Sequence, residues 1–292
     1  MPAEQRESPV DVASLSAAAS RAGAMTRASR ENFPVAPRVL PRGIRTHLLA
    51  IYGFARLVDD TGDERAGDRA AHLDALERDL DRVFSGGDPE HPLLADLVPT
   101  VRACGLDQEP FRQLIQANRQ DQQVRRYERL TDLLGYCELS ANPVGHLVLQ
   151  VFGAASPGRR RLSDAVCTAL QLVEHLQDVA EDLGRDRIYL PAEDMARFGV
   201  RAADLASAPA SAAVRRLVAF EARRARAWLD IGSGLVPASP ALLAVAVAGF
   251  VAGGHATLDS MEAVDHDVLA HSVLPHPGRV LVRWSRLLVG WR

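Results

Sequence analysis

The strongest constraint on the fold is a helical repeat of apolar residues that runs through most of the chain. In residues 42–58 (RGIRTHLLAIYGFARLV) apolar side chains recur every three or four positions, as they do on one face of a helix. Residues 70–84 repeat the pattern, and only residues 187–190 (RIYL) indicate extended chain. Further helices are expected at about 92–104, 110–126, 130–152, 161–184, 212–232, 241–264 and 277–291. The sequence therefore predicts one all-α domain of roughly ten helices.

Composition excludes several classes of protein. The chain has 292 residues, which is enough to bury a large core, and its 34 basic and 37 acidic residues nearly balance. That balance argues against a protein that holds nucleic acid by bulk electrostatics. Three cysteines without a CxxC pair argue against a disulfide framework or a zinc site. The charged N-terminal residues do not resemble a signal peptide, so we expect a cytoplasmic protein.

One apolar segment needs to be weighed against a membrane span. Residues 231–258 contain no Asp, Glu, Lys or Arg, and residues 241–252 are almost wholly apolar. A spanning helix needs about 20 apolar residues, whereas prolines precede this run and glycines with a histidine interrupt its end. We therefore expect a buried central helix, whose small side chains leave room for a cavity beside it.

Two pairs of aspartates are the sharpest chemical feature. Asp59 and Asp63 follow one apolar stretch, and Asp178 and Asp182 lie in another. Residues four apart project from the same helix face, so the members of each pair lie close together. A chain this acidic contains about five such pairs by chance, mostly on solvated faces, which is the competing interpretation. The apolar surroundings favour instead two carboxylate pairs that face a cavity and clamp a diphosphate through Mg²⁺.

Three longer segments resemble the squalene/phytoene synthase family. They are residues 52–63 (YGFARLVDDTGD), 136–145 (YCELSANPVG) and 171–191, in which DVAED precedes RIYLP, and the similarity covers about residues 30–195. The resemblance implies an isoprenoid-synthase helical bundle around a central cavity, formed by residues 26–292. It implies that the four aspartates bind Mg²⁺, with Glu174 as a fifth metal ligand where family members often have Asn. Residues 1–25 are rich in Ala, Ser and Arg with weak periodicity, so we expect a flexible tail or a short helix there.

The resemblance also assigns residues to the substrate. Arg56, three residues before the first aspartate, matches an arginine that contacts the diphosphate. Substrate-binding positions are expected at Phe33, Tyr52, Tyr136, Asn142, Gln171, Arg187 and Tyr189. Ordinary core packing is the alternative for the three aromatic residues Phe33, Tyr52 and Tyr136. A structural loop is the alternative for Arg187 and Tyr189.

Departures from the family pattern narrow the expected reaction. Gln177 stands where members that join two prenyl diphosphates usually carry Arg, and Glu31 stands where they usually bind the second diphosphate. With the segments ENFPVA and SANPVG, these residues resemble the hydroxysqualene synthases of bacterial hopanoid pathways. That resemblance implies conversion of presqualene diphosphate and water to hydroxysqualene and diphosphate, without a reductant and with handover between sister enzymes. The alternatives are head-to-head condensation of two prenyl diphosphates, prenyl transfer to another acceptor, and a catalytically silent scaffold.

The C-terminal stretch is a basic helix pattern. Residues 278–292 (GRVLVRWSRLLVGWR) contain two tryptophans and no acid. Such a helix can lie on an anionic bilayer, which would place the protein at the inner face of the membrane, or it can dock on the core.

Overall fold

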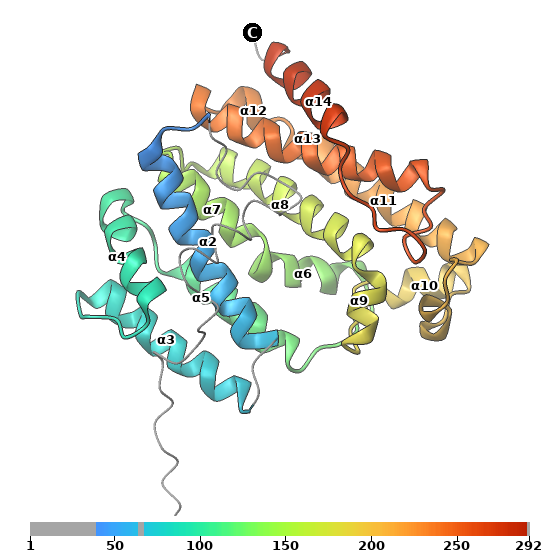
Figure 1. Ribbon diagram of the computed structural model, residues 1–292, viewed down its shortest axis with the longest axis horizontal. Helices are drawn as coiled ribbons and strands as arrows, with labels where there is room; N and C mark the ends of the chain where they lie inside the picture. The colour runs from blue at the N-terminus through green and yellow to red at the C-terminus, as the bar shows by residue number, and fades with distance from the viewer. Residues whose placement is uncertain (1–38, 64–66, 291–292) are drawn as a thin grey trace, which may run out of the picture.

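Helices built on the apolar repeats make up most of the computed structural model, which describes residues 39–63 and 67–290 (Figure 1). They are α2 (Arg42–Asp63), α3 (Arg69–Ser85), α4 (Pro92–Cys104), α5 (Glu109–Asp121), α6 (Leu130–Ser140), α7 (Asn142–Val151), α8 (Pro157–Gln177), α9 (Val179–Gly184), α10 (Ala192–Phe198), η2 (a 3₁₀ helix, Ala202–Ala206), α11 (Ala212–Gly232), α12 (Leu235–Ala238), α13 (Ala241–Ala263) and α14 (Pro277–Val289). The prediction of a single all-α domain is confirmed. The tail at 1–25, Glu31 and Phe33 lie outside the described residues.

Two helices expected to be continuous are each interrupted by one residue. The helix expected at 130–152 breaks at Ala141, because Pro143 has no N–H with which to continue the hydrogen-bond ladder. The helix expected at 161–184 breaks at Asp178, which joins α8 to α9. The Asp182 N–H still donates to the Asp178 carbonyl at 2.8 Å, so the four-residue spacing survives the break. In contrast, α2 runs on to Asp63, and both of its aspartates are helical.

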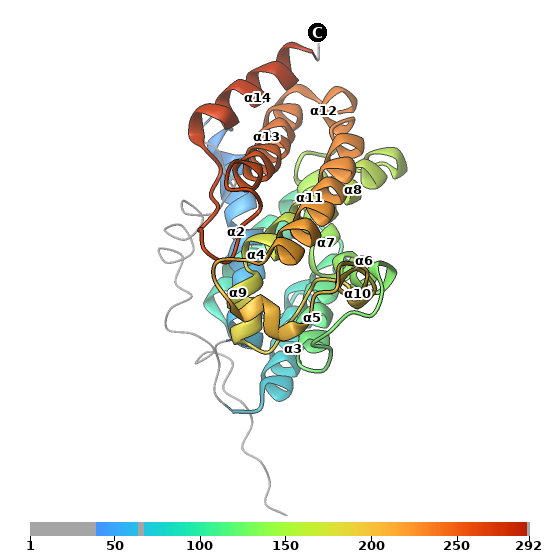
Figure 2. The same cartoon turned by 90° about the vertical axis from the view of Figure 1, so that its right-hand side faces the viewer.

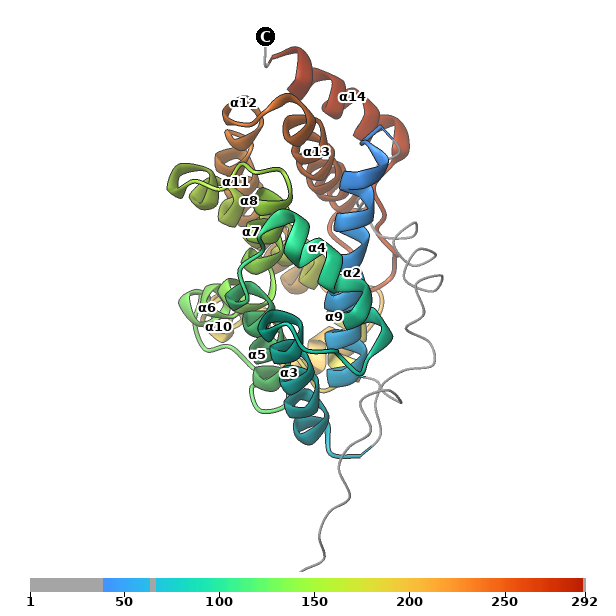
Figure 3. The same ribbon diagram turned by 90° about the vertical axis from the view of Figure 1, so that its left-hand side faces the viewer.

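The helices enclose two main hydrophobic clusters that flank the middle of the bundle. In one cluster α2 packs with α3, α4 and α5, and in the other α8 packs with α11 and α13. Figures 1 and 3 show α2 to α5 on one side and α11, α13 and α14 on the other, with α7 and α8 between them. The two aspartate pairs are therefore carried by different parts of the bundle, α2 and the α8–α9 junction.

The apolar helix α13 lies inside the bundle, as the sequence indicates. It is long and apolar enough to cross a membrane, but 78% of its most apolar window is buried against other helices. A Cβ atom on Gly254 would lie 2.8 Å from Leu170 Cδ2 and 2.9 Å from Leu229 Cδ2. Small residues on α13 thus allow close packing against α8 and α11. Figure 2 shows α14 laid along the outer side of α13.

Candidate active site

A polar pocket of about 310 Å³ lies between α2, α5, α6, α8 and α9. Its wall carries eight carboxyl groups, from Asp59, Asp60, Asp63, Asp121, Glu174, Asp178, Glu181 and Asp182, and three arginines, Arg56, Arg185 and Arg187. When all are ionised, the part of the lining within residues 39–63 and 67–290 has an excess of five negative charges. A bound cation is the direct way to offset such an excess, because like charges this close disfavour one another's ionised forms.

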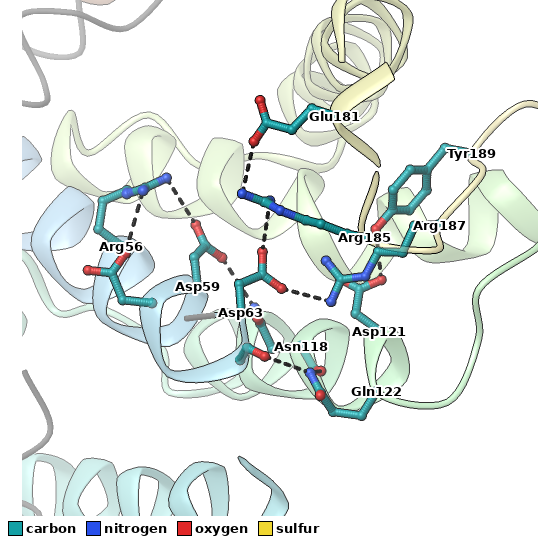
Figure 4. A network of polar contacts seen from close by, with 12 residues as sticks. Arg56, Asp59, Asp63, Asn118, Asp121, Gln122, Glu181, Arg185, Arg187 and Tyr189 are labelled. Carbon is teal, nitrogen blue, oxygen red and sulfur yellow. Dashed lines mark hydrogen bonds and ion pairs between the residues drawn. The ribbon is translucent and has the colours of Figure 1, made fainter. Parts of the chain in front are cut away.

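Asp63 is held by arginines that reach it from the chain after α9. Arg187 Nη2 lies 2.7 Å from Asp63 Oδ1, and Arg185 Nη1 lies 3.5 Å from Asp63 Oδ2 (Figure 4). Arg185 also pairs with Glu181 at 2.8 Å. Part of the repulsion expected among the aspartates is therefore offset within the protein itself. The unfavourable charge of the carboxylate cluster is therefore a weak argument against a catalytically silent scaffold.

Asp59 lies on the same helix face one turn earlier. Arg56 Nη1 is 3.8 Å from Asp59 Oδ2, and Asn118 Nδ2 donates to Asp59 Oδ1 at 3.2 Å. About half of the Asp59 side chain (49%) is exposed, and this carboxylate lines the pocket wall. Loss of bulk hydration nevertheless outweighs the arginine and raises the pKa of Asp59 to about 6.

The second aspartate pair has even less compensation. Desolvation, reinforced by Glu181, raises the pKa of Asp178 to about 6. Desolvation, reinforced by Asp178, raises the pKa of Asp182 to about 7 despite nearby Arg185 and Arg187. The anionic forms of both side chains are therefore costly in the protein alone.

This donor set fits Mg²⁺ that is bound together with a substrate. All the donors are oxygens, the charge is in excess, and Mg²⁺ usually takes one or two carboxylates while it keeps waters and phosphate oxygens. Within residues 39–63 and 67–290, no three His, Cys, Asp or Glu side chains converge on a preformed metal site. The carboxylates that would hold the metal are Asp59, Asp63, Asp178 and Asp182, with the exposed Glu174 beside them.

Tyr136, His175 and Tyr189 form an aromatic wall on part of the pocket. The hydroxyls of Tyr136 and Tyr189 both donate to Asp121, at 2.6 and 3.0 Å. The His175 ring stacks on Tyr189 with centroids 3.9 Å apart and an interplanar angle of 11°. Burial lowers the pKa of His175 to about 3, so this ring is neutral. The Asp121 carboxylate thus holds both tyrosine hydroxyls in place, and the ring of Tyr189 in turn orients His175 by stacking.

A second, apolar cavity of about 290 Å³ adjoins the polar pocket. Arg56, Asp59 and Glu174 line both spaces. Tyr52, Phe250 and mainly aliphatic side chains from α2, α7, α8, α12 and α13 form most of the remaining wall. The combined site is suited to a molecule with an anionic head and a long hydrocarbon tail.

Most residues singled out from the sequence meet in this combined site. The polar pocket is lined by Arg56, Asp59, Asp63, Tyr136, Gln171, Glu174, Asp178, Asp182, Arg187 and Tyr189, and the apolar cavity by Tyr52. Asn142 lines neither space, because it is buried and its side-chain oxygen accepts a hydrogen bond from Thr168 at 3.1 Å, which ties α7 to α8. Gln177 also lines neither, and its amide donates to the Val273 carbonyl.

Sequence reasoning missed the contribution of α5. Asn118 and Asp121 lie three residues apart on a face whose other members, Leu114 and Ala117, are buried. Two polar residues on an otherwise buried helix face were the available signal.

The chain is similar in sequence and in fold to known proteins of one family. The Squalene/phytoene synthase family profile matches residues 26–286. A hydroxysqualene synthase of Zymomonas mobilis is 36% identical over 70% of this chain and 69% of its own, and a 15-cis-phytoene synthase of Synechococcus elongatus is 34% identical over 75% of each. The crystal structure of squalene synthase HpnC from Alicyclobacillus acidocaldarius superposes with a TM-score of 0.76 at 40% identity, over 88% of this chain and 99% of that one. The names of these three proteins specify different products.

Proposed function

The chain belongs to the squalene/phytoene synthase family, and on this premise we propose that it converts presqualene diphosphate and water to hydroxysqualene and diphosphate. The observation that carries the proposal is one carboxylate-rich pocket joined to one apolar cavity at Arg56, Asp59 and Glu174. Within the family, the finer choice concerns the number of diphosphates that the site accepts and the fate of the carbocation.

The polar pocket provides the binding groups for a diphosphate. Arg56, Arg185 and Arg187 supply the cationic donors, and the two aspartate pairs supply carboxylates for Mg²⁺. When bound, Mg²⁺ stabilises the negative charge that develops on the departing diphosphate. The ion pairs of Asp63 with Arg185 and Arg187 hold these arginines at the pocket wall before substrate arrives.

The apolar cavity and the aromatic wall serve the hydrocarbon part. The carbon–oxygen bond to the diphosphate breaks and both electrons leave with the oxygen, so the C30 chain becomes a carbocation. Tyrosine faces stabilise cations, and an apolar lining keeps water away until the cation has rearranged. The oxygen of one water then bonds to carbon, and its proton passes to the released diphosphate.

The charge of the pocket favours a substrate with one diphosphate. Among the residues that the structure describes, the polar lining has three arginines against eight carboxyl groups, and one of these carboxyl groups, that of Glu174, lies at the border with the apolar cavity. A second diphosphate would need further cationic groups. Condensation of two prenyl diphosphates would require those groups to come from elsewhere, and Glu31 in the sequence argues against residue 31 as one of them.

The test is a product analysis with separate substrates. The purified protein is incubated with Mg²⁺ and no nicotinamide, with presqualene diphosphate, farnesyl diphosphate or geranylgeranyl diphosphate, and the products are identified by mass spectrometry. Hydroxysqualene from presqualene diphosphate alone is expected. Presqualene diphosphate from farnesyl diphosphate, or phytoene from geranylgeranyl diphosphate, would indicate a condensing enzyme. No product from any substrate would leave prenyl transfer to another acceptor or a scaffold.

A further inference from the structure

The C-terminal helix α14 has two different apolar faces. Its inner face packs Trp284, Leu287 and Leu288 against the core, and Trp284 Nε1 donates to the Val245 carbonyl of α13 at 2.9 Å. Its outer face exposes Leu281 (61%), Val282 and Val289 (74%). The inner face explains why α14 is docked, whereas packing within the described residues leaves the outer face uncovered.

The outer face is also basic. Arg279, Val282, Arg286 and Val289 follow one another at spacings of three and four, so cationic and apolar side chains share one stripe. Residues 277–289 contain no acid. Arg283, on the inner side, is neutralised by Asp259 at 2.7 Å. Arg279 donates to the Asp259 backbone carbonyl at 3.3 Å, which leaves its charge without an acidic partner in that contact, and both Arg279 and Arg286 are exposed.

We propose that the outer face of α14 docks on the surface of an anionic lipid bilayer. Apolar side chains flanked by arginines match the boundary between acyl chains and anionic headgroups, because the former enter hydrocarbon and the latter pair with phosphate. Charge complementarity selects this occupant over an uncharged apolar partner, which would leave the arginines without counter-charges.

The position of α14 relates this surface to the apolar cavity. Leu235 of α12 and Leu243 and Val247 of α13 form one end of that cavity, and α13 is the helix on which α14 lies (Figure 2). A bilayer at α14 would therefore lie next to the helices that hold the hydrocarbon tail. The docking itself is independent of the proposed reaction, since it needs no turnover.

The experiment measures co-sedimentation of the full chain with vesicles of phosphatidylcholine, with or without phosphatidylglycerol. Wild-type protein is expected to sediment with the anionic vesicles and to be released by high salt or alkaline carbonate. The double variants L281Q/V282Q and R279Q/R286Q should each bind about tenfold more weakly. The matched control R78Q/R102Q removes the same charge from exposed positions on α3 and α4, and should bind like wild type.

Three results would overturn the proposal. One is wild-type protein that stays in the supernatant with anionic vesicles, and another is α14 variants that sediment as fully as the control. The third is a wild-type dimer in light scattering that both α14 variants dissociate without any change in vesicle binding, which would assign the face to a second copy. Circular dichroism of each variant checks that the bundle has folded.

Discussion

Asp178 and Asp63, one residue from each aspartate pair, are predicted to respond in opposite ways to the same substitution. Asp178 has a pKa raised from 3.8 to about 6, so its ionised form destabilises the metal-free fold once the pH is well above 6. A shift of about two units corresponds to about 3 kcal/mol, which partial exposure of the side chain reduces to about 1–2 kcal/mol. Asp178→Asn removes this cost and should stabilise the protein at pH 8.

Asp63→Asn should do the reverse. It removes the carboxylate that lies 2.7 Å from the guanidinium of Arg187, a side chain only 10% exposed. Breaking a buried ion pair costs about 3–5 kcal/mol, but Asp63 is a quarter exposed and Asp121 still faces Arg187. A loss of about 1–2 kcal/mol is therefore expected.

The assay is thermal unfolding of both variants in EDTA at pH 8 and at pH 4. At pH 8 the melting temperature of Asp178→Asn should rise and that of Asp63→Asn should fall, by roughly 2–4 °C per kcal/mol. The raised pKa makes the cost of Asp178 appear only as pH rises from about 4 through 6, so most of the gain should vanish at pH 4. Both variants should lose turnover with Mg²⁺. Shifts of the same sign at pH 8 would refute this electrostatic reasoning, and wild-type turnover in either variant would refute the assignment to metal binding.

Two further predictions concern packing and a buried charge outside the pocket. A Cβ atom on Gly62 would lie 2.2 Å from Asn118 Oδ1, so Gly62→Ala should lower the free energy of unfolding by about 1–3 kcal/mol and lower turnover by displacing that amide. In the control Gly43→Ala, on the same helix, the new Cβ meets nothing within 4 Å, so this variant should unfold in urea close to wild type. Desolvation raises the pKa of Glu221 to about 7 despite its pairing with Arg224, so wild-type stability should decline as pH rises from 4.5 to 7. Glu221→Gln should flatten this decline in thermal melts taken across that pH range. An unchanged dependence of stability on pH in the variant would contradict the role of Glu221.

The local sequence pattern was enough to predict the features that depend on residues close together in the chain, namely the helices and the spacing of the aspartates. The helical repeats predict the all-α bundle, and the four-residue spacing of Asp59 with Asp63 and of Asp178 with Asp182 places each pair on one wall of the pocket. The helix break at Asp178 was not predicted, because no proline or glycine marks it in the sequence. The helix break at Ala141, in contrast, has a sequence signal in Pro143.

Contacts between distant segments could not be predicted from spacing. Arg187 reaches Asp63 over more than a hundred residues, and Asp121 joins Tyr136 to Tyr189. Asn142 lies in a motif of the family, yet it braces two helices outside the pocket. Which motif residues face a cavity is decided by tertiary packing, and the sequence pattern carries little information about it.

The origin of the product oxygen tests the central proposal most directly. Presqualene diphosphate is incubated with the enzyme and Mg²⁺ in ¹⁸O-labelled water, and the C30 product is weighed by mass spectrometry. Ionisation at carbon followed by water capture predicts an alcohol that carries one ¹⁸O atom. An alcohol without label would show cleavage at phosphorus, a hydrocarbon would show loss of a proton or reduction instead of capture, and either result would contradict the proposed reaction.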